Sequence, residues 1–557
     1  MEEMRVPSVR TSTDASVTQG LHAVRYETFS TVATVESHAD GEEKVIDAPH
    51  HVSESTPLLP RKHTPMRAPL SSSPLAQTLI LALTFALGPT FWNALQALGG
   101  AGQAERTRAS AGLAVLYACF TVSSVVMAKV GSHVARWPRA MLVLGGLGHL
   151  QYMLALRQIA QWDAVSIPHG IGTLSHSGHP PPPAASTLAW HLTLLSSAFL
   201  GLCKGPLWTT QTHLLMRYSS PGRGAGLAGL YLVVQNVVQL LGAAMPFVVN
   251  FGGGTSGGVS EETYTVATLV ISLSCITPLL LSPPDSVHSS STTTTVLSTP
   301  PTCIHADPSI KPTPTSSAWR SEIRDTIAAV SSHDILFLIP FFFSLGTPHS
   351  LLWNHINLPL FTVRTRALNT ALSCLLGILT APILGRVLDS AGATRWRARA
   401  GWGLVTGLVL ASWLGMCALA SLIGRSGAGD GVEDNKMDFI HPGAAWAVGV
   451  YAFSGVFEAA REVLVYHLLT LHPHPPHTST RISAFRHFLR AVAQSCGFAM
   501  SAAGVGVWWQ VAWVGAWCVG SMLPVYFVVD KWARRDEKDC EEGVALGVGE
   551  MVVVEEC

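Results

Sequence analysis

Residues 266–281 read Val-Ala-Thr-Leu-Val-Ile-Ser-Leu-Ser-Cys-Ile-Thr-Pro-Leu-Leu-Leu, and the apolar pattern returns only at 335–343, Ile-Leu-Phe-Leu-Ile-Pro-Phe-Phe-Phe. Between them lies a polar segment that contains Ser-Ser-Ser-Thr-Thr-Thr-Thr at 289–295. The first stretch belongs to the last of six apolar segments, and six more follow the polar one. Each is near or above the roughly 20 residues that a helix needs to cross a bilayer. Six plus six spanning helices decide the fold class.

The twelve stretches share a spanning length and a low content of charge. They run over about 75–98, 110–130, 138–157, 186–208, 225–250, 262–282, 334–359, 367–388, 400–424, 441–470, 483–505 and 507–529. Helices are predicted because hydrocarbon cannot satisfy an open backbone. Pro89, Pro206, Pro246 and Pro348 predict kinks inside them, and such kinks often border cavities in membrane proteins.

Five regions follow from this pattern. They are a disordered cytosolic tail at 1–74, a six-helix bundle at 75–282, a disordered cytosolic linker at 283–332, a second six-helix bundle at 333–529, and a cytosolic tail at 530–557. The first tail and the linker are rich in Ser, Thr and Pro and lack a sustained apolar period, which is typical of segments that do not fold.

The composition supports a protein embedded in the lipid bilayer. Of 557 residues, 48% are hydrophobic and 13% are charged, and the mean hydropathy is +0.34. A soluble domain carries about 25% charged residues. The formal net charge is zero, so we expect no nucleic-acid partner. Basic residues that flank the spans lie mostly on the same side of the membrane as the two termini. By the positive-inside rule, this side is predicted to be cytosolic. Arg364 and Arg366 are exceptions, because they are predicted to lie on the opposite side.

Equivalent loops of the two halves carry a glycine followed by basic residues, and the second loop adds an acid. These gating-loop candidates are Gly131, Arg136 and Arg139 after the second span, and Gly385, Asp389 and Arg395 after the eighth. The pattern resembles the loop signature of the major facilitator superfamily, which also has a six-plus-six architecture. The first copy has Ala135 where the acid is expected. The alternative is ordinary positive charge on cytosolic loops.

The end of the first span reads Gly-Pro-Thr-Phe-Trp-Asn-Ala-Leu-Gln-Ala-Leu-Gly-Gly-Ala-Gly-Gln over 88–103. It resembles fungal members of the Unc-ninety-three-like branch of that superfamily, as do residues 113–124 and 205–211. The resemblance implies an all-α membrane protein with the major facilitator fold, in which two six-helix bundles enclose a cavity lined mainly by spans 1, 4, 7 and 10. It also implies kinship with regulators of ion channels and trafficking chaperones.

Polar side chains within the apolar segments fall mostly on those four spans. Ionisable groups in hydrocarbon usually face a cavity or a partner. The candidate substrate or coupling residues are Asn93, Gln96, Lys204, Asn354, His355, Glu458, Arg461 and Glu462.

The three charged residues of span 10 share one helix face, because Arg461 and Glu462 follow Glu458 by three and four residues. One acid is then left over, and Lys204 or a bound proton would complete the neutralisation. This pattern predicts a proton-coupling site. The alternative is a permanent ion-pair network that locks span 10 to a neighbour.

Glu54, Leu58 and Leu59 in the N-terminal tail resemble an acidic dileucine sorting signal, which adaptors read. It predicts a vacuolar or other endomembrane location, with the plasma membrane as the alternative. No P-loop or HExxH motif occurs in the sequence, so we expect no enzymatic activity, cofactor or metal site.

Two functions are compatible with these patterns. The first is a secondary transporter that moves an unidentified small molecule or ion by alternating access, with protons as the candidate coupling ion. The second is a non-transporting Unc-ninety-three-like regulator or chaperone of an ion channel or another membrane protein.

Overall fold

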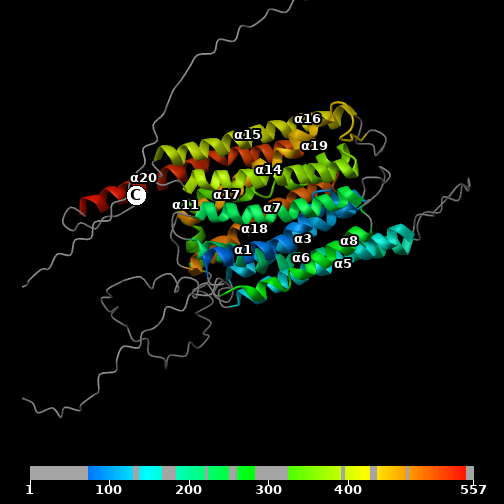
Figure 1. Cartoon of the computed structure of the whole chain (residues 1–557), viewed down its shortest axis with the longest axis horizontal. Coiled ribbons are helices and arrows are strands. Elements are labelled where there is room, and N and C mark those ends of the chain that lie inside the picture. The colour runs from blue at the N-terminus through cyan, green and yellow to red at the C-terminus, as the bar shows by residue number, and fades with distance from the viewer. Residues whose placement is uncertain are drawn as a thin grey trace, which may run out of the picture. The chain divides into compact units, whose positions relative to one another are not determined.

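The computed structural model describes residues 73–103, 105–129, 137–165, 183–219, 224–249, 259, 261–282, 324–389, 395–426, 436–471 and 476–546. Helices occupy all twelve predicted stretches (Figure 1). In the N-terminal half they are α1 (Pro74–Phe85), η2 (Ala86–Thr90), α2 (Phe91–Gln96), η3 (Gly100–Gly102), α3 (Arg106–Lys129), α5 (Pro138–Val165), α6 (Pro183–Tyr218), α7 (Gly224–Val249), α8 (Glu261–Leu273) and η4 (Thr277–Leu280). In the C-terminal half they are α11 (His333–Ser344), α12 (Pro348–Ser350), η5 (Leu351–Asn357), α13 (Leu358–Leu360), α14 (Val363–Asp389), α15 (Arg395–Ser426), α16 (Ala444–Ala452), α17 (Ser454–Leu471), α18 (Pro476–Ala502), α19 (Val507–Gly520) and α20 (Met522–Leu546).

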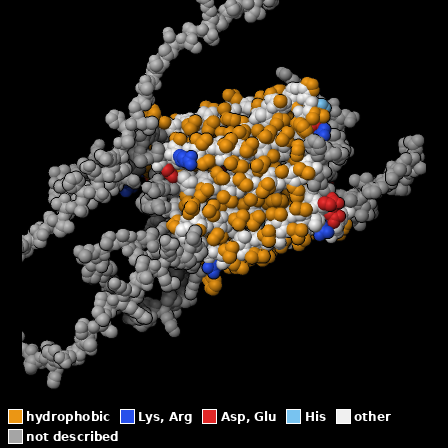
Figure 2. All heavy atoms as spheres, in the orientation of Figure 1, with side chains coloured by type: hydrophobic (Ala, Val, Ile, Leu, Met, Phe, Trp, Pro, Cys, Tyr) orange, Lys and Arg blue, Asp and Glu red, His pale blue; other side chains and the backbone are white. Residues whose placement is uncertain are grey.

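Eight helical segments of the described residues are long and apolar enough to cross a membrane. Figure 2 shows apolar side chains covering the visible face between the two ends of the helices, with the charged side chains near those ends. Large apolar side chains such as Leu195, Val248 and Ile383 are more than half exposed. A soluble protein rarely exposes so much contiguous apolar surface. The prediction of an all-α membrane protein is therefore confirmed, while the full number of twelve crossings stays a prediction.

Two of the four predicted proline kinks interrupt their helices. Pro89 lies inside the π-helical turn η2, and Pro348 begins the short α12 that precedes the π-helical turn η5. Proline lacks an N–H and collides with the preceding turn, so the regular helix cannot continue there. These breaks are at equivalent positions of the two halves. Helices α6 and α7, in contrast, continue through Pro206 and Pro246.

Two helix pairs hold the halves together: α7 packs along α14, and α3 packs along α18. The α7–α14 contact is close because each helix places a glycine against the other's backbone. A Cβ added to Gly385 would come within 2.8 Å of the Ala225 carbonyl oxygen, and one added to Gly229 would come within 2.8 Å of the Ala381 carbonyl oxygen. Small residues four apart let membrane helices approach in this way.

Arg364 and Arg366, which run against the charge rule, both have specific partners. Arg364 forms an ion pair with Asp438, with 2.7 Å between its Nε and the carboxylate. Arg366 is almost fully buried and donates to the Leu98 carbonyl oxygen at 2.8 Å, across the boundary between the halves. Charge at this end of the bundles therefore serves contacts between segments, which explains the exception.

Candidate functional site

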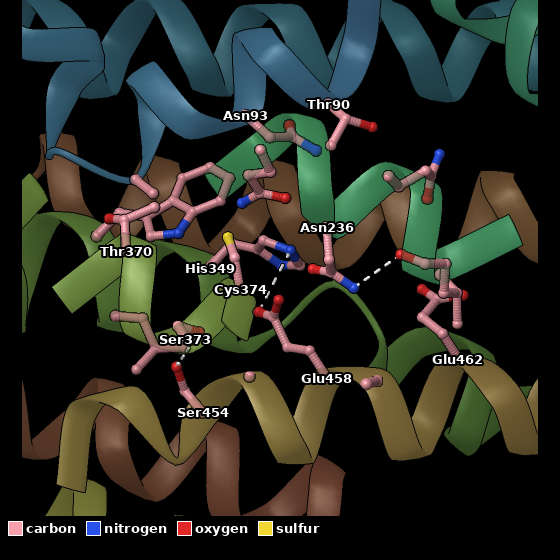
Figure 3. A pocket seen from close by; sticks show the side chains of 18 of the residues that line it. Thr90, Asn93, Asn236, His349, Thr370, Ser373, Cys374, Ser454, Glu458 and Glu462 are labelled. Atoms are coloured by element: carbon pink, nitrogen blue, oxygen red, sulfur yellow. Dashed lines mark hydrogen bonds and ion pairs between the residues drawn. The ribbon is translucent and has the colours of Figure 1, made fainter. Parts of the chain in front are cut away.

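A cavity of about 110 Å³ lies between the two halves, beside the π-helical turns (Figure 3). Its polar lining comes from α2, α7, α14, α17 and α18 and from the residues around both turns. The polar lining residues are Thr90, Asn93, Tyr231, Gln235, Asn236, Gln239, His349, Thr370, Ser373, Ser454, Glu458, Glu462, Tyr466 and Arg490. Since a water occupies about 30 Å³ of the liquid, this volume suits a few waters or a small solute.

Glu458 is the acid most open to the cavity. Its side chain is 41% exposed although α17 lies inside the bundle, because the exposed surface faces the cavity. The nearest ionisable partner is His349, whose Nε2 lies 3.8 Å from Glu458 Oε1. Among the described residues no lysine or arginine comes within 4.0 Å of this carboxylate. An ionisable side chain that faces a cavity within a membrane protein is a candidate for the functional site.

The orientation of His349 determines where a proton can bind. Its Nδ1 lies 3.3 Å from the Gly346 carbonyl oxygen and carries a proton when it donates there. Nε2, which faces Glu458, is then unprotonated in the neutral ring. One added proton, on either Nε2 or the carboxyl, changes the net charge of the Glu458–His349 pair from −1 to 0. The pair can therefore exchange a single proton with the cavity.

Glu462 also lines the cavity but is held by two guanidiniums. Arg486 and Arg490, both on α18, form ion pairs with opposite oxygens of its carboxylate. The Arg486 side chain is 1% exposed and also stacks over the Tyr466 ring. Sequence reasoning missed these partners, although two arginines four residues apart at the start of an apolar stretch were a usable signal.

Arg461 and Lys204, the two expected cations, do not line the cavity. Arg461 donates to the Ser344 carbonyl oxygen at 2.6 Å and lies over the Phe457 ring. Lys204 is buried, with its Nζ 3.7 Å from the centre of the Trp92 ring. Neither cation forms an ion pair within 4.0 Å with a span 10 acid among the described residues, so the expected neutralisation by a second cation or a bound proton stays a prediction.

Of the four candidate residues that are not permanently charged, one lines the cavity and three do not. Asn93 lines the cavity, whereas Gln96 is fully buried outside its lining. Asn354 accepts from the Gly100 amide at 3.1 Å and donates to Ser110 Oγ at 2.9 Å. His355 contacts Arg106 and Gln510, at 2.9 and 2.8 Å. Asn354 and His355 therefore connect the two halves and do not line the cavity.

Hydrogen bonds join the halves on both sides of the cavity. At the end opposite the predicted cytosolic one, the Asn354 and His355 contacts are joined by Asn357, which donates to the Ala97 carbonyl oxygen at 2.7 Å. At the predicted cytosolic end, α6 meets α17 and α18. Three side-chain pairs make that contact: Gln211–Tyr466 at 2.9 Å, Thr212–His487 at 2.9 Å and His213–Thr480 at 2.8 Å. Opening either side requires one of these sets to break.

The second gating-loop copy also links the halves. Asp389 accepts from the Ala225 and Gly226 amides at 3.1 and 2.5 Å, which caps the N-terminus of α7 with an acid from α14. Arg395 pairs with Asp530 at 2.8 Å.

In the first copy, Arg139 donates to the Leu281 carbonyl oxygen at 2.8 Å. Gly131 and Arg136, and the sorting-signal candidates Glu54, Leu58 and Leu59, lie outside the described residues.

No family model matches the chain. An UNC93-like protein of Schizosaccharomyces pombe is 23% identical over 400 residues, which cover 71% of this chain and 70% of the relative. UNC93-like protein 1 of Arabidopsis thaliana is 23% identical over 442 residues, which cover 79% and 84%. The crystal structure of a bacterial homologue of the iron transporter ferroportin in its outward-facing state superposes with a TM-score of 0.50 at 12% identity and covers 83% and 99%. The chain thus has the major facilitator fold and is similar to UNC93-like proteins over most of its length.

Proposed function

We propose that this protein is a secondary transporter that moves a small solute by alternating access and couples the movement to a proton held by Glu458 and His349. One observation carries the proposal: an acid that has no arginine or lysine within 4.0 Å among the described residues faces a central cavity. Bundles that rock around a central site expose it to each side in turn. The hydrogen bonds on the two sides of the cavity are the contacts that such a movement would break alternately.

The contrast between the two acids supports a different role for each. Glu462 keeps two arginines as permanent partners, so it serves as a structural charge. Glu458 can be neutralised by a proton or by a cationic solute, and competition between the two would couple their movements. Asn93, Asn236 and Ser454 supply amide and hydroxyl groups that can bind the solute beside it.

The test is uptake into proteoliposomes driven by an imposed proton gradient, with K⁺, amino acids and sugars as the panel. Glu458→Gln should abolish gradient-driven uptake while the protein stays folded by size-exclusion chromatography. Glu261→Gln is the matched control, because this acid pairs with Arg157 at the surface, outside the cavity lining. Uptake that survives Glu458→Gln with its proton dependence intact would contradict the proposed role.

One observation favours a second function, that of a non-transporting regulator of another membrane protein. The cavity, which Trp208, Trp353 and Tyr451 help to line, has a volume of about 110 Å³, well under the roughly 300 Å³ of a small-molecule pocket. Absence of uptake across the panel in well-folded protein, with a changed activity of a co-purifying channel or receptor, would favour this function.

For either function we propose an endomembrane location, which the protein would reach through adaptors that read Glu54, Leu58 and Leu59.

A further inference from the structure

His355 lies between two N–H donors that come from different helices. Its Nδ1 is 2.9 Å from Arg106 Nη2, which is also 3.3 Å from Nε2, and its Nε2 is 2.8 Å from Gln510 Nε2. The orientation of the Gln510 amide follows from its other contacts. Its oxygen accepts from Ser350 Oγ at 3.0 Å, and its nitrogen donates to the Gly497 carbonyl oxygen at 3.4 Å. Both nitrogens of the imidazole therefore face donors.

The ring can accept from either donor only while it is neutral. A neutral imidazole has one nitrogen that accepts and one that donates, whereas a protonated ring has two donors and no acceptor. The guanidinium of Arg106 is always charged. A proton added to His355 would remove the hydrogen bond that the ring accepts and would place two positive charges 2.9 Å apart. The residue is 5% exposed, so little water screens the repulsion.

The elements around His355 supply no carboxylate within 4.0 Å of the ring in the described part of the chain. Helices α13 and α19 carry no acidic or basic residue. The charged residues of α18 precede Gly497 by seven positions or more, and those of α15 are confined to its first five and last two positions. Other charged or titratable side chains near these contacts along the chain have partners of their own: Glu105 with Arg108, His349 with Glu458, and Arg366 with the Leu98 carbonyl oxygen.

The contact between His355 and Arg106 joins the two halves on the predicted non-cytosolic side of the cavity. Arg106 begins α3 of the N-terminal half, whereas His355 and Gln510 belong to the C-terminal half. The preceding residue, Asn354, makes a second contact between the halves through the Gly100 amide. Loss of the Arg106 contact therefore weakens the set of hydrogen bonds that holds the halves together at that end.

We propose that His355 is a proton-sensitive latch: acid on the predicted non-cytosolic side protonates the ring, repels Arg106 and opens the cavity to that side. The inference rests on the alternating movement proposed above and adds its regulation by pH. A histidine in water has a pKa of about 6.5. The open state, in which water reaches the ring, binds the extra proton, so opening is favoured as the pH falls. Between about pH 7.5 and 5.5 the ratio of open to closed protein should rise about tenfold.

The test uses the full-length protein in detergent and follows the reaction of Cys374, a cavity-lining thiol, with a water-soluble methanethiosulfonate reagent. Mass spectrometry of the peptide that contains Cys374 separates this thiol from the other cysteines. Each rate is divided by that of His355→Gln at the same pH, which cancels the effect of pH on the thiol and on Glu458 and His349. Glutamine can still accept from Arg106 and takes no proton. The wild-type ratio should be about tenfold higher at about pH 5.5 than at about pH 7.5.

His191→Gln is the matched control, because this histidine is exposed on α6 and lies outside the cavity lining. It should keep the tenfold effect. Gln510→Glu is a second variant, which also serves where His355→Gln does not fold. It places a carboxylate beside Nε2, so that a protonated ring gains an ion pair. The labelling rate of Gln510→Glu relative to wild type should therefore fall about tenfold between about pH 7.5 and 5.5.

A wild-type ratio that stays constant with pH would overturn the latch, as would an equal response to acid in Gln510→Glu and wild type. Thiol labelling measures opening and not transport. Absence of uptake in the proteoliposome assay, together with a pH-dependent labelling ratio, would therefore reject the transporter and retain the latch. Proton-driven uptake with a constant ratio would do the reverse.

Discussion

Glu458 and Glu462 lie one helical turn apart on α17, and neutralising each should have very different consequences for stability. Glu462→Gln removes the carboxylate shared by Arg486 and Arg490, whose side chains are 1% and 17% exposed. Breaking a buried ion pair by removing one partner costs about 3–5 kcal/mol, since the remaining charge stays buried. Glu458→Gln removes a charge whose one ionisable partner within 4.0 Å, among the described residues, is His349, so we expect a change below about 1 kcal/mol, or a gain.

Thermal unfolding of the purified protein in one detergent measures the contrast. A domain of 150–250 residues shifts by about 2–4 °C per kcal/mol, so Glu462→Gln should lower the Tm by about 6 to 20 °C. Glu458→Gln should leave it within about 4 °C. Combining Glu462→Gln with Arg490→Gln should recover part of the loss, because only Arg486 is then unpaired. Equal Tm values for the two single variants would refute the assignment of Glu462 as the structural acid and Glu458 as the exchangeable one.

Three further changes test the contacts between the halves. Gly385→Val should lower the yield of monodisperse protein, because a Cβ at this position would lie 2.8 Å from the Ala225 carbonyl oxygen. Gly403→Val on α15 is the control, because a Cβ there has no atom within 4 Å. Equal yields of the two variants would contradict the close packing of α7 on α14. Asp389→Ala should cost about 1 kcal/mol by removing the cap of α7, and Asp389→Asn, which keeps one of the two acceptor oxygens, should recover part of it in thermal unfolding. Asn354→Ala removes bonds to Gly100 and Ser110 and should speed thiol labelling of a cysteine placed at Asn93 from the predicted non-cytosolic side; an unchanged rate would argue against a gate there.

The spacing of apolar residues predicted the helices, since lipid imposes a length and an internally bonded backbone on each span. It also placed Asn93, Glu458 and Glu462 on helices that border the central cavity. The length of a helix and the polar residues that it carries depend on that segment alone, so they can be predicted one segment at a time. The π-helical breaks at Pro89 and Pro348 belong to the same class, because the missing N–H of proline acts within its own helix.

The pairing of charges could not be predicted in this way. Glu462 has its partners 24 and 28 residues further along the chain, on α18, whereas Arg461, the residue before it, donates to the Ser344 carbonyl oxygen. Lys204 points at Trp92 inside its own bundle. The sequence by itself determined which helices carry polar groups and how long those helices are. Only the tertiary structure decided which charges meet, because a partner depends on how each helix is rotated and crossed against helices distant in sequence.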